Sequence, residues 1–582
     1  MAVLSPQKGC HPPLHIKLKR LLSAAQHRHP LFRSEGDTMG KIPAVKAAVI
    51  HAMLQPSVEP ADIGPATERV FEGRMRFANL IGITVWTATM TFFWLWWLRS
   101  DHIIGWPSYL LVTLVLAWIT GLPAYFIVIV HDARRMPQAG GPLPAGRIAM
   151  VVTRASSDPL SLVQTTLRAM LDQTGCDFDV WLAEEKPSLE MMKWCMEHGV
   201  FTSTTRGSAG ADAPDLSPHC KQGNLRSFYD HFGYERYDFV VQIDAGHVPE
   251  RIYLREIVRP FRDPSVGYVS APSISDADAA SSWAARGRLS ADAGIQGVLQ
   301  SGYNNGWAPL CMGTHYAVRT AALKEIGGPG PEPAEDLSTT LAMNASGWRG
   351  THALDAIAHG DGPATFADLM MQEFDRSRSR MTTLLRYSTA YMPKLPGWLK
   401  FQLLFSELWY PLFSLGLAII FMLPIVALLT GHSFADVTYP AFLLHFLPIA
   451  GAMIAIAFIW RATGAFRPAD ARIISWESMA FLLLRWPWSL MGCAAAIRDR
   501  LTRSPSDSRV APERIAEARA LPLRVLAPYI AISLASALAM VFAADREAAQ
   551  GLFIFAAINT LIYAALIGLI IARHRTESMP SR

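Results

Sequence analysis

Acidic and polar side chains stand at the ends of three short apolar runs in the middle of the chain. When such runs form neighbouring strands of a parallel sheet, their carboxyl ends meet at one edge, where nucleotide-type ligands bind. The three ends therefore predict a ligand crevice, although each acid taken alone could equally be a solvated loop carboxylate. The side chains are Thr153 and Arg154 after the run 147–153, Glu184 and Glu185 after 179–183, and Asp244 at the end of 237–244.

The segments between these runs have the spacing of amphipathic helices, and they must position the strand ends. The ranges 158–172, 188–198 and 250–261 each follow one apolar run. An alternation of strand and helix is typical of a parallel sheet with helices on its faces. The sequence therefore predicts an α/β domain with its ligand at the carboxyl ends of the strands.

Long apolar stretches lie on both sides of this block, two before it and four after it. Each is close to the roughly 20 residues that a helix needs to cross the hydrocarbon of a bilayer. With 51% hydrophobic residues and a mean hydropathy of +0.20, the 582-residue chain is too apolar for one soluble globule. We expect membrane-spanning helices at 78–98, 108–130, 411–429, 439–460, 525–544 and 551–572.

Charge places the block and both termini on the same side of the membrane. Arginines flank the predicted spans at Arg74, Arg76, Arg134 and Arg135, and they are frequent in 461–524. Positive residues stay in the cytoplasm, so we expect a multi-pass protein of the cytoplasmic (inner) membrane with a cytosolic block and cytosolic termini.

These flanks also account for the net charge of +5, so we expect no nucleic acid as a partner. Six scattered cysteines without paired spacing argue against a disulfide framework or a zinc site, and fit a reducing compartment. The first 40 residues have no cleavable signal peptide, and Met39 is an alternative start.

Two further segments are expected at the membrane surface. Residues 381–410 combine aromatic and basic side chains, and Pro393 and Pro396 should divide them into two amphipathic helices. Residues 478–497 are apolar but carry Arg485 and Pro487 near the centre, which favours an interfacial segment over a seventh span.

From about residue 70 to its end, the chain resembles the processive family-2 glycosyltransferases of the cellulose synthase and hyaluronan synthase type. The resemblance includes the order of spans and a series of short motifs. They are Lys221-Gln-Gly-Asn224, Asp244-Ala-Gly-His247, Cys311-Met-Gly-Thr314, Ala334-Glu335-Asp336 and Gln372-Glu-Phe-Asp-Arg376.

This resemblance implies an α/β nucleotide-sugar transferase (GT-A-like) domain inserted between α-helical transmembrane segments. It implies Asp336 as the general base beside Glu335, and Mg²⁺ or Mn²⁺ held by Asp244 and His247. The implied donor-binding residues are Thr153, Arg154, Glu184, Lys221, Asp244 and Gln372, and the implied acceptor-binding residues are Cys311, Gly313 and Trp348.

The chain departs from the family pattern at several positions. Glu184 replaces the first Asp, and Gly246 replaces the second Asp of Asp-x-Asp. Asp375 and Arg376 stand where the family has Arg and Trp, and the loop motif around Ser508, Ala511 and Glu513 also differs. His247 could replace the lost metal ligand, and one of Arg376, Arg378 or Arg380 could serve the diphosphate in place of the missing Arg.

The function that the resemblance implies is transfer of a sugar from a UDP-sugar to a growing polysaccharide, with export across the bilayer. UDP-glucose is the first candidate donor, and UDP-N-acetylglucosamine is the second. The implied partners are a nucleotide sugar, a glycan acceptor, the lipid bilayer and accessory polysaccharide-export proteins. Two alternatives stay open, a catalytically degenerate scaffold that partners an active synthase and a non-processive transferase that decorates a lipid carrier.

The expected organisation follows from these assignments. We expect eight segments along the chain. They are a basic cytosolic arm at 1–76, two spans within 77–131, the transferase domain at 147–380, interface helices at 381–410, two spans within 411–460, a cytosolic interface helix and gating-like loop at 461–524, two spans within 525–572 and a cytosolic tail at 573–582.

Overall fold

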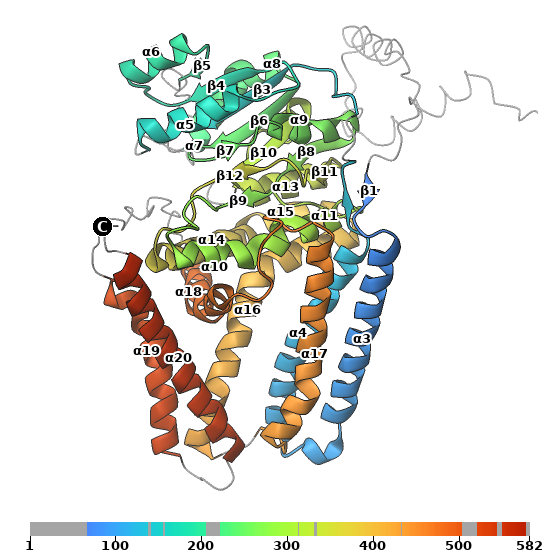
Figure 1. Ribbon diagram of the computed structural model, residues 1–582, viewed down its shortest axis with the longest axis vertical. Coiled ribbons are helices and arrows are strands. Elements are labelled where there is room, and N and C mark those ends of the chain that lie inside the picture. The colour runs from blue at the N-terminus through green and yellow to red at the C-terminus, as the bar shows by residue number, and fades with distance from the viewer. Residues whose placement is uncertain are drawn as a thin grey trace, which may run out of the picture. The chain divides into compact units, whose positions relative to one another are not determined.

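A seven-stranded mixed sheet forms the centre of the transferase-like block (Figure 1). The computed structural model describes residues 67–137, 141–154, 158–204, 221–311, 313–330, 335–431, 434–502, 521–543 and 550–577. All of them belong to the unit Pro65–Arg582. Most of the predicted N-terminal arm and the loop motif at Ser508–Glu513 lie outside the described residues.

The sheet has the strand order β11-β8-β10-β6-β3-β4-β5. Its strands are β3 (Ile148–Thr153), β4 (Asp179–Ala183), β5 (Phe201–Ser203), β6 (Phe239–Asp244), β8 (Val266–Ser270), β10 (His315–Arg319) and β11 (Arg349–His352). The strands β3, β4 and β6 confirm the three strands predicted from the apolar runs. Their parallel pairing is also as expected.

The sequence predicted a parallel sheet, and this prediction is wrong for one strand, β10. β10 runs antiparallel to both of its neighbours, β6 and β8. Because of this reversal, the start of β10 lies at the edge where β3 and β6 end. Thr314, which enters β10, therefore accepts a backbone hydrogen bond from Asp244 at 2.8 Å.

Helices cover both faces of the sheet, which explains why the strands are continuously apolar. Met150 and Val152 of β3 belong to the hydrophobic core on one face, with α5 (Leu160–Leu171), α6 (Leu189–Glu197) and α9 (Tyr253–Val258). Ala149 and Val151 belong to the core on the other face, with α7 (Lys221–Phe228), α12 (Thr320–Glu325) and α13 (Glu335–Ala345). A small sheet of β7 (Val248–Pro249), β12 (Ala358–His359) and β9 (Ser273–Ile274) adjoins the site.

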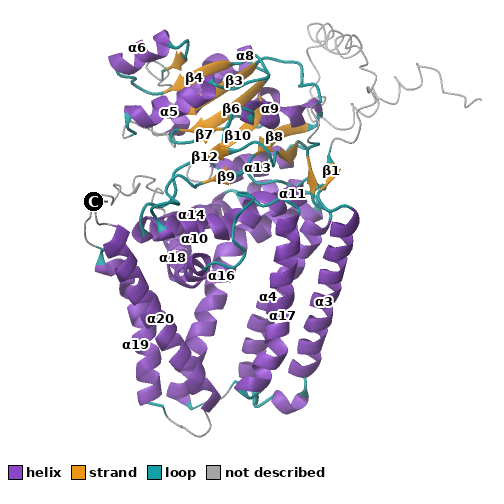
Figure 2. Cartoon of the chain, viewed as in Figure 1, coloured by secondary structure: helices purple, strands orange, loops and turns teal. Residues whose placement is uncertain are grey.

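Long apolar helices lie at the other end of this unit from the strands (Figure 2). Seven helices among the described residues are long and apolar enough to cross a membrane. Six of them cover the predicted spans to within a few residues, and the seventh is α18. They are α3 (Gly73–Trp97), α4 (Trp106–His131), α16 (Gly397–Thr430), α17 (Tyr439–Ala462), α18 (Trp476–Leu501), α19 (Leu523–Val541) and α20 (Gln550–Glu577).

Helix α18 differs from the other six in its surroundings. Its most apolar window is 61% buried inside the protein, compared with 17–44% for the others. It packs against α14 (Phe366–Arg386) and α10 (Trp283–Gly294), below the sheet in Figure 1. A helix that is covered by protein and carries a paired arginine fits the predicted interfacial position, although its length alone would allow a span.

The predicted pair of interface helices at 381–410 needs correction. The first helix, α14, begins at Phe366, where Thr365 and Asp368 form a capping box. After α15 (Ser388–Tyr391) and a short 3₁₀ turn at Met392–Lys394, α16 begins at Gly397 and continues through Pro411 to Thr430. Residues 397–410 are therefore the first turns of the membrane-type helix, and Pro411 is tolerated inside it, as prolines are in membrane helices.

One buried carboxylate joins the helices beneath the sheet. Glu373 of α14 is fully buried and forms ion pairs with Arg288 of α10 at 2.6 Å and with Arg485 of α18 at 2.8 Å. A carboxylate at this depth is tolerated because two guanidinium groups share its charge. The pair partners come from three separate helices, so this contact fixes their relative positions.

Removing the charge of Glu373 should destabilise the protein. In Glu373→Gln, two buried guanidinium groups lose their common partner, so we expect a loss of about 3–5 kcal/mol in stability. Thermal unfolding of the detergent-purified protein measures this loss. The control Glu197→Gln breaks an exposed pair with Lys193 and should change stability by less than about 1 kcal/mol. Equal effects of the two substitutions would contradict a structural role for Glu373.

Candidate active site

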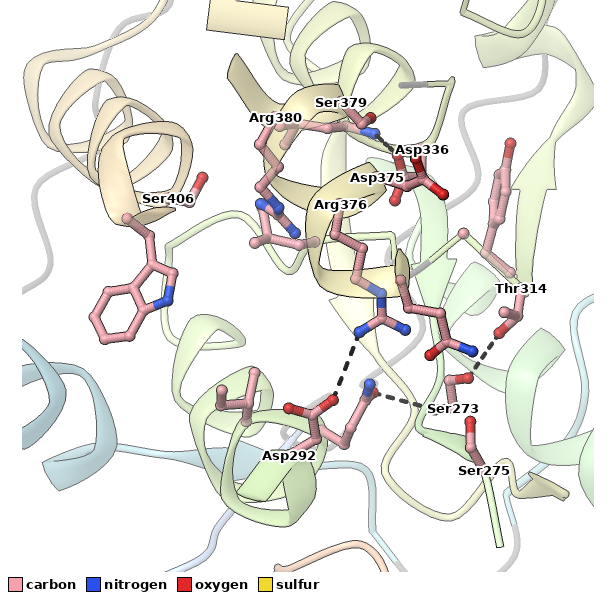
Figure 3. Close-up of a pocket in the computed structure, with 18 of the residues that line it drawn as sticks. Ser273, Ser275, Asp292, Thr314, Asp336, Asp375, Arg376, Ser379, Arg380 and Ser406 are labelled. Atoms are coloured by element: carbon pink, nitrogen blue, oxygen red, sulfur yellow. Dashed lines mark hydrogen bonds and ion pairs between the residues drawn. The ribbon is translucent and has the colours of Figure 1, made fainter. Parts of the chain in front are cut away.

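A cavity of about 650 Å³ opens at the edge of the sheet where β3 and β6 end. The sheet edge, the first turn of α13, one face of α14 and the aromatic side chains of α4 and α16 line it. Figure 3 shows the polar side chains that converge on it from these elements. The cavity therefore joins the α/β domain to three of the seven candidate membrane helices, namely α4, α16 and, through Arg485, α18.

The sheet edge supplies Asp244 and Thr153. The two residues are register partners on the parallel strands β6 and β3, and the Thr153 hydroxyl donates to the Asp244 carboxylate at 3.5 Å. Next to them, the Thr314 hydroxyl donates to the Ser273 hydroxyl at 2.8 Å. Four segments that are far apart in the sequence, namely β3, β6, β9 and the residue before β10, thus place oxygen atoms at one edge.

The loop after Asp244 has a glycine, Gly246, where the family has a second carboxylate. Gly246 has a φ of +94°, and its backbone N–H donates to Thr166. A side-chain carbon on Gly246 would lie 3.6 Å from an oxygen of Asp361, so this acid lies near the position where the family has a second Asp. Among the described residues, no group of three or more His, Cys, Asp or Glu side chains is arranged to hold a metal.

His247 lies away from the cavity. Its ring is buried between Gly360 and the ring of His315, with 5.8 Å between the two histidine centroids. The predicted metal pair of Asp244 and His247 is therefore not assembled as a pair that faces the cavity. A divalent cation at Asp244 would take its other ligands from substrate phosphates and water, as Mg²⁺ commonly does.

Asp336 faces the same cavity as Asp244. It lies in the first turn of α13, where the backbone N–H of Leu337 donates to its carboxylate at 2.7 Å. Burial raises the pKa of Asp336, while the charge of Arg380 and this backbone hydrogen bond oppose that effect. A buried carboxylate with a raised pKa suits a group that accepts a proton.

Two neighbours position this carboxylate. Gly313 has a φ of +81°, and a side-chain carbon there would lie 3.2 Å from an oxygen of Asp336. Glu335, the preceding residue, accepts a hydrogen bond of 2.8 Å from the Tyr316 hydroxyl of β10. Gly313 thus leaves room for Asp336, and Tyr316 ties the start of α13 to the sheet.

One face of α14 forms the next wall. Gln372, Asp375, Arg376, Ser379, Arg380 and Thr383 line the cavity, at the three- and four-residue spacing of one helix face. Arg376 lies 3.7 Å from the carboxylate of Asp292, as Figure 3 shows. Burial raises the pKa of Asp375 to about 6, with Arg378 opposing it.

Other predicted donor-side residues lie behind this lining. Arg154 and Glu184 form a buried ion pair with each other, and neither lines the cavity. Burial raises the pKa of Glu184, and Arg154 opposes it. Asn224, in the motif after Lys221, donates to the backbone carbonyl of Arg154 at 3.3 Å. The side chain of Lys221 lies outside the described part of the structure.

Two predicted acceptor-side residues also lie outside the cavity lining. The Cys311 side chain is buried, and burial raises its pKa. Trp348 precedes β11, which is parallel to β8, so it lies at the amino edge of the sheet, opposite Asp244. Its indole N–H donates to Glu325 at 3.0 Å. The structure does not bring Trp348 to the site.

Aromatic side chains from the candidate membrane helices α4 and α16 line one side of the cavity. Tyr125 of α4 stacks on Phe405 of α16 with 4.0 Å between ring centroids. Trp409 lies one turn after Phe405 and also lines the cavity. The Tyr125 hydroxyl lies 2.9 Å from that of Tyr303. No local sequence signal links Tyr125 to residues 280 positions away, so sequence reasoning missed this wall.

Comparison with known proteins agrees with this geometry. The model of the glycosyl transferase family group 2 matches residues 239–460. No curated protein matches the chain.

Several solved structures are similar to this chain at low sequence identity. A mannosyltransferase from Pyrobaculum calidifontis, in complex with GDP-Man and Mn²⁺, is 16% identical over 73% of this chain and 99% of its own, with a TM-score of 0.40. Glucosyl-3-phosphoglycerate synthase from Mycobacterium tuberculosis, in complex with Mn²⁺, UDP and glucosyl-3-phosphoglycerate, is 14% identical over 41% and 78%, with a TM-score of 0.27. TarS from S. aureus is 12% identical over 61% and 92%, with a TM-score of 0.30.

The matched stretch contains β6, β8, β10 and β11 of the sheet, the start of α13 with Asp336, and the helices α14, α16 and α17. It therefore includes most of the residues that line the cavity, among them Asp244 and Asp336. Residues 239–460 are thus similar to the glycosyl transferase family group 2, and the mixed sheet belongs to a GT-A-like α/β fold.

Proposed function

We propose that this protein is a membrane-bound β-glycosyltransferase that transfers sugar from a UDP-sugar to a growing polysaccharide and exports the product. UDP-glucose is the first candidate donor. The observation that carries the proposal is that Asp244 and Asp336 line one cavity whose far wall comes from the candidate membrane helices α4 and α16.

In the proposed reaction, Asp244 lies at the donor diphosphate and Asp336 accepts the proton of the acceptor hydroxyl. The nucleotide diphosphate of the donor is assigned to the sheet edge at Asp244 and Thr153, and the sugar extends towards Asp336. An acceptor hydroxyl attacks the anomeric carbon, its proton passes to the Asp336 carboxylate, and the bond from that carbon to the diphosphate oxygen breaks. Attack from the face opposite the diphosphate converts an α-linked donor into a β-linked product.

Asp244 is the residue that would hold Mg²⁺ or Mn²⁺, and Asp361 is the nearest additional acid at the position of Gly246. Such a cation, when bound, neutralises charge on the leaving diphosphate. The protein's own part at this edge is to present the Asp244 carboxylate, with the Thr153 hydroxyl fixing one of its oxygens.

The aromatic wall supports an acceptor glycan. Tyr125, Phe405 and Trp409 offer flat apolar surfaces to a sugar ring, and they belong to helices that lead into the bilayer. This arrangement supports export beside the site of transfer. The cytosolic orientation and the inner membrane rest on the arginine-rich flanks of the spans.

The scaffold alternative has one observation in its favour. Gly246 stands where the family pattern has a carboxylate that binds the metal. Asp375 stands where the pattern has an arginine that binds the diphosphate. A scaffold would bind no UDP at millimolar concentration and would crosslink strongly to an active synthase. Calorimetric titration with UDP therefore separates the two functions.

Replacing the proposed base should abolish transfer and spare donor binding. In Asp336→Asn, the hydroxyl proton has no acceptor, so we expect sugar transfer to fall about 10²–10⁴-fold. Turnover of radiolabelled UDP-glucose by membranes measures transfer, and titration with UDP measures donor binding. The control Asp172→Asn alters an exposed pair with Arg251 and should keep full activity. Normal turnover in Asp336→Asn would refute the assignment of the base.

The raised pKa of Asp336 sets a pH dependence. Because the base must be ionised to accept a proton, transfer should fall on the acid side at a pH above the ordinary carboxylate pKa of about 3.9. Asp375, with its pKa raised to about 6, lines the same cavity. The pH–rate profile of Asp375→Asn separates the two groups, because the acid limb should persist in this variant. Its disappearance would assign the limb to Asp375.

Chelation should reduce transfer, because the described residues provide Asp244 as the carboxylate at the diphosphate end. We expect that excess EDTA lowers turnover more than tenfold and that added Mn²⁺ or Mg²⁺ restores it. Asp244→Asn should raise the metal concentration needed for half-maximal activity by about tenfold or more. Unchanged activity in excess chelator would refute a metal-dependent reaction.

A further inference from the structure

Six arginines line the cavity, and five of them are already neutralised by carboxylates. Arg380 is the exception: among the described residues no carboxylate forms an ion pair or a hydrogen bond with it, and Asp336 and Glu407 interact with it only as charges at longer range. The five pairs are Arg288–Glu373, Arg376–Asp292, Arg378–Asp499, Arg467–Asp355 and Arg485–Glu373.

Arg380 lies on the acceptor side of Asp336. It follows Gln372 by eight residues on the same face of α14, which places it about 12 Å further along the helix axis from the donor edge. It lies within electrostatic range of the carboxylates of Asp336 and Glu407, and also of Tyr303 and Tyr410, which line the cavity near the aromatic wall. Figure 3 shows Arg380 reaching into the cavity between Ser406 of α16 and Asp336.

A guanidinium in this position is suited to an anionic ligand. Its planar fork of N–H donors matches the oxygens of a carboxylate or phosphate, and such bonds are about twice as strong as neutral ones. Arg380 is partly buried in the cavity wall, so an anion in direct contact would stabilise its charge further. Each of the five neighbouring arginines lies within ion-pair distance of a carboxylate, so a partner at that distance from Arg380 is expected on the ligand.

We propose that Arg380 binds a carboxylate or phosphate group carried by the acceptor, so that the acceptor of this transferase is anionic. The inference rests on the proposed function and adds the charge class of the acceptor. The donor diphosphate is the weaker candidate for this partner, since Asp244 and Gln372 mark the donor end and Arg380 lies two turns beyond them. The anion would lie next to the stacked rings of Tyr125 and Phe405.

The test compares the full-length protein in nanodiscs with Arg380→Gln and Arg380→Lys. Calorimetric titration measures the affinity for UDP, for an oligosaccharide of uronic acids and for its carboxyl-reduced neutral counterpart. A second set of nanodiscs contains a polyprenyl phosphate, and transfer from UDP-glucose to that lipid is measured. Arg386→Gln is the matched control, because it removes the same charge from α14 outside the cavity lining.

We expect the unmodified protein to favour an anionic probe over the neutral one by about tenfold or more. Arg380→Gln should remove this preference, Arg380→Lys should retain part of it, and the affinity for UDP should stay unchanged in both. A preference for the uronic acid oligosaccharide identifies a glycan carboxylate, whereas transfer to polyprenyl phosphate that requires Arg380 identifies a lipid phosphate.

Three results would overturn the proposal. In the first, Arg380→Gln weakens UDP binding and leaves the acceptor preference intact, which assigns the arginine to the donor. In the second, the unmodified protein shows no preference for either anionic probe. In the third, only the pH–rate profile shifts, which makes Arg380 a positioning residue for Asp336. Failure of UDP binding in the unmodified protein, with anion preference retained, would instead count against the proposed donor alone.

Discussion

The buried carboxylate of Glu373 is the interaction on which the arrangement of the site depends. It holds Arg288 and Arg485, so helices α10, α14 and α18 are locked together beneath the sheet. A lone carboxylate at this depth would be unstable, and either guanidinium alone would be as well. Because each group requires the others, the position of α14 relative to its neighbours is determined by charge as well as by packing.

The rotation of α14 then decides which of its side chains reach the cavity. With Glu373 turned towards the neighbouring helices, Gln372, Asp375, Arg376 and Arg380 face the cavity. The departure from the family motif at Asp375 and Arg376 is therefore a change in the lining of the site. One helix thus connects the fold, through Glu373, to the chemistry, through the adjoining face that lines the cavity.

The strands β3, β4 and β6 could be predicted from the sequence because a run of residues buried on both faces is apolar throughout. Asp244 could be placed as well, since it ends such a run. The aromatic wall could not, because Tyr125 and Phe405 are 280 residues apart and each resembles an ordinary residue of an apolar helix. Trp348 was expected at the acceptor from the family resemblance, and it lies instead at the opposite edge because β11 is parallel to β8.

By itself, the sequence determined the elements that local composition specifies, namely the apolar helices, the buried strands and the acids at strand ends. Only the tertiary structure decided which of those acids share a cavity, because β10 reverses the sheet and brings Gly313 and Thr314 to the edge with Asp244. The tertiary structure also decided which arginines of the cavity form ion pairs with carboxylates of the protein. Charge pairing between helices distant in the chain depends on contacts that no sequence spacing records.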